Sequence, residues 1–315
     1  MEKKEKISIV IPCYYSEKTI GIVVDKIHHT MTKRKEYDYE IILVNDGSKD
    51  RTWEIISEMA KKNHTVKAIN LSQNFGQHSA MMAGYRKATG DIIAGMDDDG
   101  ENDPEEIFLL LDKLNEGYDC VCAEYEMHDS AFRSIGTKVN NWMACYLLNK
   151  PKELTLTSYY VMRRFVADQV IKYEHSYPYI AGLLLQATKN WGTVKLVRKE
   201  RISGSSGYSL RKLLSLWING FTAFSVKPLR IATVLGILFS VIGFIMAFVV
   251  VVRKLLGEDI LLGYSSLMAC MCFIGGMLML IMGMIGEYVG RIYISINNSP
   301  QYVIREEVDL EKEEV

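Results

Sequence analysis

The first 125 residues alternate between short apolar runs and segments with helical periodicity. Helices are expected at 17–31, 52–62, 76–89 and 104–115. The strand-like runs are ISIVI (7–11), EIILV (40–44), VKAIN (66–70), DIIAGM (91–96) and DCVCA (119–123). This alternation predicts an α/β fold with a mostly parallel sheet and helices on both faces. Ligands of such sheets bind at the carboxyl ends of the strands.

The fourth strand-like run ends in three consecutive carboxylates, Asp97, Asp98 and Asp99. Adjacent acids repel one another at the end of a buried strand unless a cation or a ligand with many donors neutralises them. Carboxylate oxygens suit Mg²⁺ or Mn²⁺, which complete their shells with water and substrate phosphates. The alternative is a solvated acidic turn that leads into a helix at Asp103 and Pro104, since Asp, Gly and Asn are ordinary turn residues.

Two other strand ends carry polar or conformationally special residues. Pro12-Cys13-Tyr14 follows the first run, and Asn45-Asp46-Gly47-Ser48 follows the second. These ends are expected to meet the aspartate triplet in one crevice, where Asp46 accepts hydrogen bonds from a nucleotide base or ribose. A turn and helix N-cap is the plainer interpretation of the second segment, and both interpretations can hold at once. The sequence lacks the glycine-rich phosphate loops of dinucleotide-binding and P-loop proteins.

Composition excludes several other classes. The 315 residues can form two domains or one large one, and the net charge of −1 gives no basic field for nucleic acid. The six cysteines form no C-x-x-C or His-flanked cluster, so we expect reduced thiols and no structural zinc. The charged N-terminus passes directly into a strand-like run without the pattern of a signal peptide, which favours a cytoplasmic catalytic part.

The C-terminal third has the pattern of a membrane protein. An apolar stripe beside Arg211 and Lys212 predicts an amphipathic interfacial helix. Residues 231–252 and 264–286 are long and apolar enough to form two transmembrane helices. The distribution of Lys and Arg around these spans favours a cytoplasmic catalytic domain and cytoplasmic termini. Small residues in both spans allow close packing within the chain or between subunits of a dimer or tetramer.

These patterns predict four parts of the chain. They are a cytoplasmic catalytic domain at 1–208, an amphipathic juxtamembrane helix at 209–228, a two-helix transmembrane domain at 229–290 and a cytoplasmic tail at 291–315. The acidic end of the tail, from residue 306, is expected to be mobile.

Several motifs together resemble a known family. They are Pro12-x-Tyr14, VNDGS, LSQNFGQHSAMMAGYRKATGD, the aspartate triplet with DPEEI, and two spans ending in GEYVGRIY. The chain resembles the bacterial polyisoprenyl-phosphate glycosyltransferases of glycosyltransferase family 2, which include dolichol-phosphate mannose synthases and the aminoarabinose transferase for undecaprenyl phosphate. The resemblance covers nearly the whole chain. It implies a Rossmann-like GT-A catalytic domain and a divalent metal, Mg²⁺ or Mn²⁺.

The resemblance also implies roles for individual residues. Donor binding is expected at Pro12, Tyr14, Asp46, Asp97 and Asp98. Metal binding is expected at Asp97 and Asp99, and lipid-phosphate binding at Arg133, Thr137 and Arg201. Asp97, Asp99 and Arg133 are the expected catalytic residues, because arginine suits phosphate and a metal stabilises a departing diphosphate.

Five positions depart from the family pattern. They are Ser16, Glu101, Tyr125, Ser158 and Gly207, where relatives commonly carry Glu, Gln, Arg, Asp and Lys respectively. Because these positions surround the expected donor and acceptor sites, the donor or the sugar differs from that of the better-known relatives, or activity is reduced.

The function implied by this resemblance is an inverting, metal-dependent transfer of a sugar from a nucleotide-sugar donor to polyprenyl (undecaprenyl) phosphate. It would take place at the cytoplasmic face of the inner or plasma membrane, in a multi-pass protein, and supply lipid-linked sugar for cell-envelope glycans. One alternative is a weakly active or inactive family member that serves as a membrane scaffold. Another is a glycosyltransferase with a different lipid or glycan acceptor.

Overall fold

The structure is a computed structural model that divides the chain into two units. It describes residues 4–125, 145, 150, 151, 154, 156–197, 263–296 and 299–310, and scattered residues between 234 and 256. The first unit comprises residues 1–214 with 298–315, and the second comprises residues 215–297. The expected interfacial helix at 209–228 lies outside the described residues.

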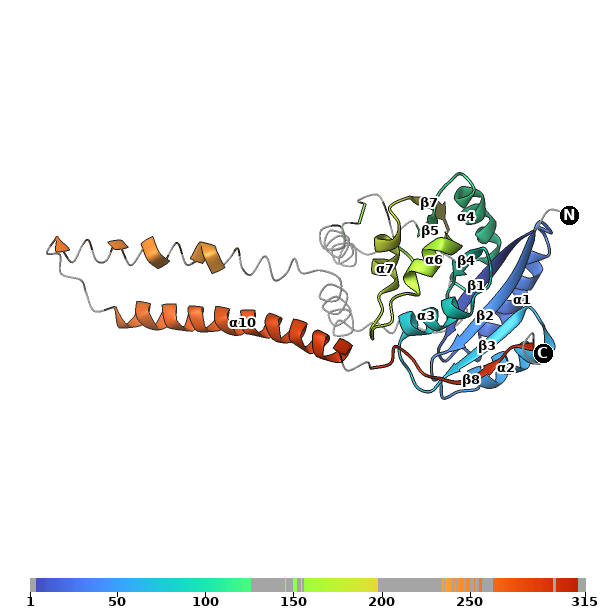
Figure 1. Cartoon of the computed structure of the whole chain (residues 1–315), viewed down its shortest axis with the longest axis horizontal. Coiled ribbons are helices and arrows are strands. Elements are labelled where there is room, and N and C mark those ends of the chain that lie inside the picture. The colour runs from blue at the N-terminus through green and yellow to red at the C-terminus, as the bar shows by residue number, and fades with distance from the viewer. Residues whose placement is uncertain are drawn as a thin grey trace. The chain divides into compact units, whose positions relative to one another are not determined.

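An eight-stranded sheet forms the centre of the first unit (Figure 1). Its strands are β1 (Glu5–Cys13), β2 (Tyr37–Asn45), β3 (Val66–Leu71), β4 (Ile92–Gly95), β5 (Cys120–Tyr125), β6 (Tyr160–Arg163), β7 (Trp191–Leu196) and β8 (Ile304–Val308). They are arranged in the order β7-β5-β6-β4-β1-β2-β3-β8. Strand β1 is parallel to β2 and β4, and β2 is parallel to β3. Because β6 and β8 are antiparallel to their neighbours, the sheet is mixed.

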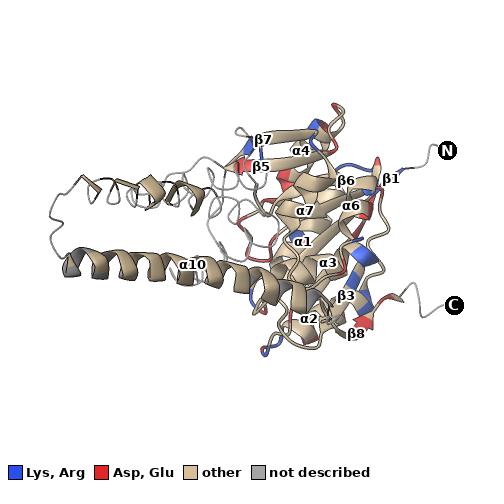
Figure 2. Cartoon of the chain, turned by 60° about the vertical axis from the view of Figure 1, so that its left-hand side comes forward, with Lys and Arg blue, Asp and Glu red and all other residues tan. Residues whose placement is uncertain are grey.

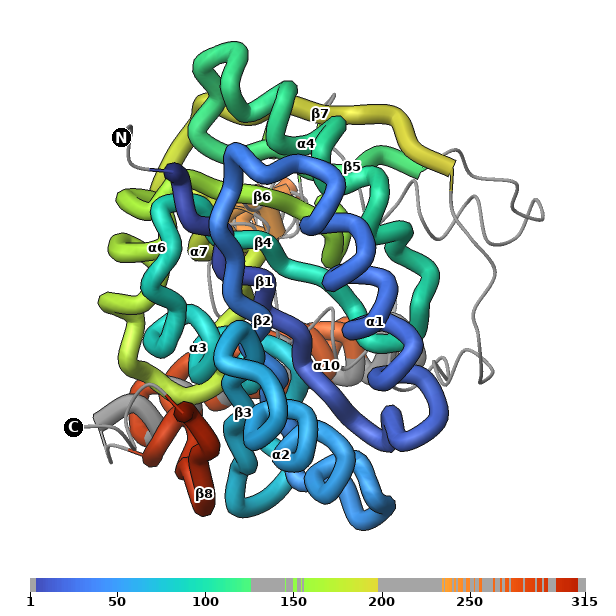
Figure 3. The backbone as a smooth tube through the Cα atoms, turned by 90° about the vertical axis from the view of Figure 1, so that its right-hand side faces the viewer, coloured from blue at the N-terminus to red at the C-terminus, as the bar shows by residue number. Residues whose placement is uncertain are grey.

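Helices cover both faces of this sheet, as the alternation predicted. They are α1 (Ile20–Met31), α2 (Thr52–Lys62), α3 (Gln77–Lys87), the 3₁₀ turn η1 (Pro104–Glu106), α4 (Ile107–Leu114), α6 (Arg164–Val170) and α7 (Ile180–Ala187). Helices α1, α2 and α4 pack on one face and share a core with β1, β2 and β4. Helix α3 lies on the opposite face with α6, and α7 packs against α6 (Figure 3).

Strand β1 is buried on both sides because it lies in the middle of the sheet. Ile7, Ile9 and Ile11 belong to the core shared with α1 and α2. Val10 points to the other face, where Gly84 lets α3 approach the strand closely. A Cβ on Gly84 would lie 2.3 Å from Cγ1 of Val10, so a larger residue there would force Val10 or α3 to move.

The register of the parallel strands brings their carboxyl ends to one edge of the sheet. Cys13 pairs with Asn45, and Asn45 pairs with Asn70. Strand β4 pairs with β1 up to Gly95, opposite Val10. The loops that follow β1, β2, β3 and β4 therefore converge at this edge, where ligands of open α/β sheets bind.

The C-terminal tail is not a wholly mobile end, and this expectation was wrong for its first part. Residues Ile304–Val308 form β8 at the edge of the sheet beside β3. The ammonium group of Lys87 lies 2.6 Å from Glu307, and Lys67 lies 3.5 Å from Asp309. The acidic residues of the tail thus pair with cations of the sheet and of α3, which the sequence pattern alone did not reveal.

The second unit contains α10 (Tyr264–Ile296), a helix of 33 residues. Its window Phe273–Gly290 has a mean hydropathy of 1.6 and is long and apolar enough to cross a membrane. Most of α10 carries no Lys, Arg, Asp or Glu (Figure 2). The structure describes only scattered residues of the expected span at 231–252, and the apolar helix found there, Gly236–Ile245, is shorter than a membrane span. Two transmembrane helices are therefore still a prediction.

A buried carboxylate links β1, β2 and β3. Glu40 is only 1% exposed, and its Oε1 accepts hydrogen bonds from Ser8 Oγ at 2.5 Å and from Thr89 N–H at 2.7 Å. The ammonium groups of Lys6 and Lys67 lie 3.1 and 3.2 Å from Oε2. Burial raises the pKa of Glu40, but the hydrogen bonds and the two cations outweigh burial and lower the pKa to about 2.

We expect this carboxylate to make stability depend on pH. Its pKa is lower in the folded chain than in the unfolded chain, so its contribution is present above about pH 5 and is lost as pH falls toward 2. Glu40→Gln should cost about 3 kcal/mol at pH 7, and the difference from wild type should shrink by about half at pH 3. Urea unfolding of the full chain in mild detergent measures this. The control Glu58→Gln removes an exposed ion pair with Lys62 and should cost under about 0.5 kcal/mol at both pH values. A pH-independent difference for Glu40→Gln would contradict the assignment.

Candidate functional site

The turn after β1 presents two tyrosines to solvent. Tyr14 and Tyr15 are 51% and 52% exposed, and their rings meet edge to face at 4.7 Å. Tyr15 has a φ of +56°, a left-handed conformation that is costly for a residue with a bulky side chain. Its N–H donates to Ser48 Oγ at 3.1 Å, and the next N–H, of Ser16, donates to Thr52 Oγ1 at 2.9 Å. Hydrogen bonds to the β2–α2 segment thus hold the strained turn in place.

Asp46, at the end of β2, is buried and holds the loop before α3. Its carboxylate accepts hydrogen bonds from the N–H groups of Phe75 at 2.7 Å and Gly76 at 2.9 Å. Burial raises the pKa of Asp46, although these two donors lower it in part. Gly47 follows with a φ of +66°, and a Cβ there would lie 2.4 Å from the backbone carbon of Gln73. Asp46 and Gly47 therefore fix how the loops after β2 and β3 pack together.

The three aspartates that follow β4 have different partners. Asp97 accepts hydrogen bonds from Gln77 Nε2 at 2.8 Å and from the hydroxyl of Ser158. Asp98 accepts from Tyr14 N–H at 3.1 Å through Oδ2, which also accepts the hydroxyl of Ser16. Asp99 Oδ1 accepts a hydrogen bond from the N–H of Glu101 at 3.0 Å, so this partner lies in the same loop as Asp99. Segments from three other parts of the chain therefore meet at this loop.

Burial and, to a smaller extent, repulsion between neighbouring acids disfavour the charged state of this acidic loop. Burial raises the pKa of Asp97 to about 6, with further increases from the charges of Asp99, Asp98 and Glu101. The hydrogen bond from Ser158 acts in the opposite direction. Burial likewise raises the pKa of Asp98, against the hydrogen bonds from Ser16 and Tyr14. A nearby cation would relieve this repulsion.

The acidic loop fits a hard divalent cation of the Mg²⁺ or Mn²⁺ type. Asp97 and Asp99 offer carboxylate oxygens on a partly exposed loop that carries excess negative charge. Among the described residues, no group of three or more His, Cys, Asp or Glu side chains is placed so that it could hold a metal ion by itself. Mg²⁺ is usually held by one or two carboxylates and completed by water and substrate phosphates, so this sparse donor set suits an ion that arrives with a diphosphate.

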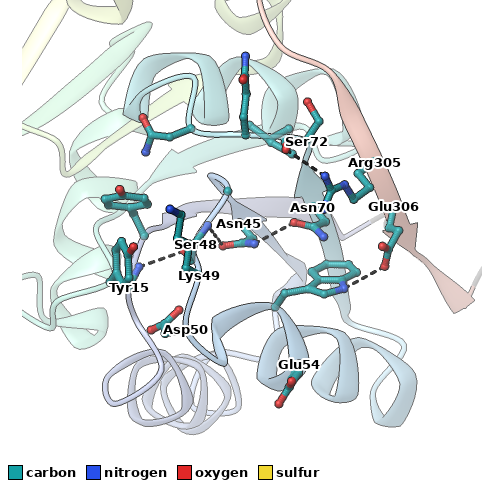
Figure 4. Close-up of a pocket in the computed structure, with 16 residues that line it drawn as sticks. Tyr15, Asn45, Ser48, Lys49, Asp50, Glu54, Asn70, Ser72, Arg305 and Glu306 are labelled. Atoms are coloured by element: carbon teal, nitrogen blue, oxygen red, sulfur yellow. Dashed lines mark hydrogen bonds between the residues drawn. The ribbon is translucent and has the colours of Figure 1, made fainter.

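A pocket of about 530 Å³ lies at the carboxyl ends of β1, β2 and β3 (Figure 4). The lining includes Tyr14 and Tyr15, the loop from Gly47 to Asp50, and Trp53. The amide side chains that line it are Asn45, Asn70, Gln73 and Asn74, and the cations are Lys49 and Arg305. Its volume, aromatic rings and amides suit a nucleotide-sized ligand. Because Tyr14 lines the pocket and its N–H donates to Asp98, the pocket adjoins the acidic loop.

The structure brings together some of the expected site residues and leaves others undescribed. Tyr14 and the three aspartates meet, whereas Pro12 lies within β1, opposite Val44 of β2. The carboxylate of Asp46 holds a loop and is not part of the pocket lining. The expected lipid-phosphate residues Arg133, Thr137 and Arg201, and the departure at Gly207, lie outside the described residues.

Three of the departures from the family pattern are hydrogen-bonded into the acidic loop. Ser16 donates to Asp98 and Ser158 donates to Asp97, so each replacement supplies a hydroxyl donor to a carboxylate. The hydroxyl of Tyr125 accepts from Asn102 Nδ2 at 2.9 Å, and Asn102 Oδ1 accepts the N–H of Asp97 at 2.9 Å. The excess acidic charge is therefore accompanied by extra donors.

Sequence reasoning missed several residues at the site. They are Gln77, Asn102, Trp53, Arg305 and Glu306. Gln77 stands at the start of a predicted helix within a family motif, which was a weak signal. Arg305 and Glu306 had no signal, because they lie far along the chain, just before and at the start of a segment that was expected to be mobile.

Comparison with known proteins agrees with this architecture. Residues 8–171 match the model of glycosyl transferase family 2, and residues 227–292 match a GtrB C-terminal hairpin. The glucosyl-3-phosphoglycerate synthase of Mycobacterium tuberculosis, solved with Mn²⁺ and UDP-glucose, has a similar fold. The two structures have a TM-score of 0.51 and 20% sequence identity, and the match covers 74% of this chain and 78% of the synthase.

Relatives at higher identity match the chain from end to end. The uncharacterized glycosyltransferase YkcC of Bacillus subtilis is 34% identical over 99% of this chain and 97% of its own length. The undecaprenyl-phosphate 4-deoxy-4-formamido-L-arabinose transferase of Proteus mirabilis is 33% identical over 99% and 96%. A prophage-derived bactoprenol glucosyl transferase of Shigella flexneri is 32% identical over 95% and 97%. The chain therefore belongs to glycosyltransferase family 2, as its motifs indicated, and is a glycosyltransferase with a GT-A-like catalytic domain.

Proposed function

We propose that the chain transfers a sugar from a nucleotide-sugar donor to a polyprenyl phosphate, with inversion at the anomeric carbon. The observation that carries this proposal is the hydrogen bond from Tyr14 N–H to Asp98, because it joins the nucleotide-sized pocket to the acidic loop. The acceptor is supported by relatives named as transferases of undecaprenyl phosphate and bactoprenol. A donor with its nucleoside in the pocket would then have its diphosphate beside the carboxylates.

Asp97 and Asp99 would hold the divalent cation, Mg²⁺ or Mn²⁺. When bound, the ion supplies positive charge that stabilises the departing diphosphate. Gln77 and Ser158 fix the orientation of the Asp97 carboxylate through hydrogen bonds to its two oxygens. In the donor site Tyr14 contacts the nucleotide, while Asp46 acts by holding the adjacent loop. Direct contact of Pro12 or Asp46 with the donor is still a prediction.

The acceptor phosphate needs no general base. An alkyl phosphate has a second pKa near about 6, so it is largely dianionic at neutral pH. One of its oxygens forms a bond to the anomeric carbon as the bond from that carbon to the donor diphosphate breaks, and the electron pair leaves with the diphosphate. The hydroxyl of Ser158 in place of a carboxylate is compatible with this chemistry, since the protein only has to position the groups and neutralise charge.

The lipid phosphate would bind at Arg133, Thr137 and Arg201, because guanidinium groups pair with phosphate oxygens in a bidentate geometry. The second unit would anchor the enzyme through two transmembrane helices, with the catalytic domain and both termini in the cytoplasm. Support for this comes from α10 and from the match to a GtrB C-terminal hairpin. A dimer or tetramer would pack through the small residues of the spans.

Removing the carboxylate at 99 should abolish transfer. With undecaprenyl phosphate and Mn²⁺, wild type should consume at least one sugar nucleotide from a broad panel, and Asp99→Ala should lower turnover about 100-fold or more. Electron paramagnetic resonance titration should show weaker Mn²⁺ binding by the variant. Asp112→Asn, on the exposed surface of α4, is the matched control and should behave as wild type. Full turnover by Asp99→Ala would contradict the metal role, and no turnover by wild type with any donor would support the scaffold alternative.

Asp98 should act through hydrogen bonds rather than charge. Asp98→Asn keeps an oxygen that can accept from Tyr14 N–H and Ser16 Oγ, so the KM for the donor should stay within about threefold of wild type. Asp98→Ala removes both hydrogen bonds and releases the strained turn, and should raise this KM about tenfold. Steady-state kinetics of both variants, with the sugar nucleotide that wild type consumes in the donor panel, measures this KM. An equal increase in the KM for the donor in both variants would show that the charge of Asp98 matters instead of its hydrogen bonds.

Arg133→Ala should affect the lipid acceptor more than the donor. Loss of a charge-assisted hydrogen bond to phosphate should raise the KM for undecaprenyl phosphate about tenfold or more, with nucleotide affinity changed by less than about twofold. Arg133→Lys keeps the charge but not the two-pronged geometry of the guanidinium, so its KM for undecaprenyl phosphate should lie between those of wild type and Arg133→Ala. Initial rates against lipid concentration and calorimetric titration of the nucleotide separate these effects. A parallel loss of both affinities would rule out the assigned role.

A further inference from the structure

The segment at 299–309, here called the strap, belongs to the first unit and makes hydrogen bonds with the part of this unit that precedes α10 in the chain. The carbonyl of Ser299 accepts from Ser176 Oγ at 2.6 Å. Gln301 Nε2 donates to the backbone carbonyls of Tyr173 and His175 at 3.2 and 2.9 Å. Arg86 of α3 donates to Gln301 Oε1 at 3.0 Å. The start of the strap therefore has a defined path over the loop between α6 and α7.

The strap then enters the sheet as β8. Its register places Glu306 opposite Asn70 of β3, with an irregularity at Asn70 and Leu71. The carbonyl of Val303 accepts from Ser72 N–H at 2.8 Å, which extends the pairing to the loop after β3. The strap thus passes the carboxyl end of β3, where the pocket lies.

Two strap side chains line the pocket (Figure 4). Glu306 Oε2 accepts from Trp53 Nε1 at 3.0 Å, which orients the indole that also lines the pocket. Arg305 donates to the carbonyl of Ser72 at 3.4 Å, and this is the one hydrogen bond that its side chain makes with another described residue. A guanidinium has five N–H donors, so Arg305 has others to offer a ligand.

The charges around the pocket indicate which end of a donor lies at the strap. Glu54, which follows Trp53 on α2, and Glu306, which accepts from Trp53, line the pocket and would repel a diphosphate at this end. Tyr14, by contrast, is bonded to the acidic loop where the cation is proposed to bind. The diphosphate therefore belongs at the Tyr14 end, and the nucleoside extends toward Trp53 and Arg305. The carbonyl and ring-nitrogen acceptors of a nucleobase can accept hydrogen bonds from Arg305. The flat ring of the base can pack against the indole of Trp53.

We infer that the strap completes the donor pocket, with Arg305 as a direct contact of the nucleobase and Glu306 as a positioning residue for Trp53. This inference rests on the proposed nucleotide-sugar function. Because α10 ends at Ile296 and the strap begins at residue 299, the segment that follows the membrane unit supplies part of the donor site. Donor affinity thus depends on correct docking of the C-terminal strand.

The test compares a whole nucleotide with its diphosphate part alone. UDP, GDP and inorganic pyrophosphate are titrated into the full chain in detergent with Mn²⁺, by calorimetry. Arg305→Ala should raise the Kd of the nucleotide that wild type prefers at least fivefold and leave the Kd of pyrophosphate within twofold. Arg305→Lys should raise the Kd of the nucleotide by less than Arg305→Ala does. Arg34→Ala, which removes a surface arginine paired with Asp112, is the matched control and should leave all three affinities unchanged.

Glu306 provides an independent arm of the test. Glu306→Gln keeps an oxygen that can accept from Trp53, whereas Glu306→Ala does not, so only the alanine variant should weaken nucleotide binding and change the tryptophan fluorescence response to nucleotide. Unchanged nucleotide affinity in Arg305→Ala, or an equal loss for pyrophosphate, overturns the base contact while the proposed function stands. If wild type binds neither nucleotide nor pyrophosphate, both the inference and the proposed function fail.

Discussion

The repulsion among three consecutive carboxylates at the end of β4 is the constraint around which the site is built. Burial raises the pKa of Asp97 and Asp98, and the charges of neighbouring acids raise it further. Asp97 is held by donors from α3 and from the segment before β6, and Asp98 by donors from the turn after β1, whereas Asp99 accepts from its own loop. The position of β4 between β1 and β6 in the sheet makes these contacts available.

The same interaction explains residues that looked anomalous in the sequence. Ser16 and Ser158 stand where carboxylates are common in the family, and each donates its hydroxyl to an aspartate of the triplet. A carboxylate at either position would face another carboxylate at hydrogen-bonding distance and add to the repulsion. The chain thus combines an acid at 98 with a hydroxyl at 16, and the turn that carries Tyr14 and Tyr15 depends on this pair. The departures are internally consistent, which favours a working site over a decaying one.

The sequence predicted the part of the fold that arises from local periodicity. Strands β1 to β5 and the helices between them appear close to their expected ranges, because buried parallel strands and amphipathic helices leave short-range patterns. Strands β6, β7 and β8 were not predicted, because the regular alternation stops after residue 125 and these strands pair with partners distant in the chain. In the site, the meeting of Tyr14 with the aspartate triplet was predicted from their positions at the ends of strands, whereas their roles in donor and metal binding are still predictions. Gln77, Trp53 and Arg305 were not predicted there, because ordinary surface residues become site residues only through tertiary placement.

Strand β8 also has a consequence for the order in which the protein can fold. Chains emerge from the ribosome N-terminus first, and domains generally fold as units while they emerge. Here the last strand of the catalytic sheet is encoded after α10, so β3 stays an open edge while the intervening residues are made. An open edge can pair with strands of other chains and lead to aggregation. The nascent enzyme therefore passes through a stage that needs shielding, and truncation before residue 299 would leave it there permanently.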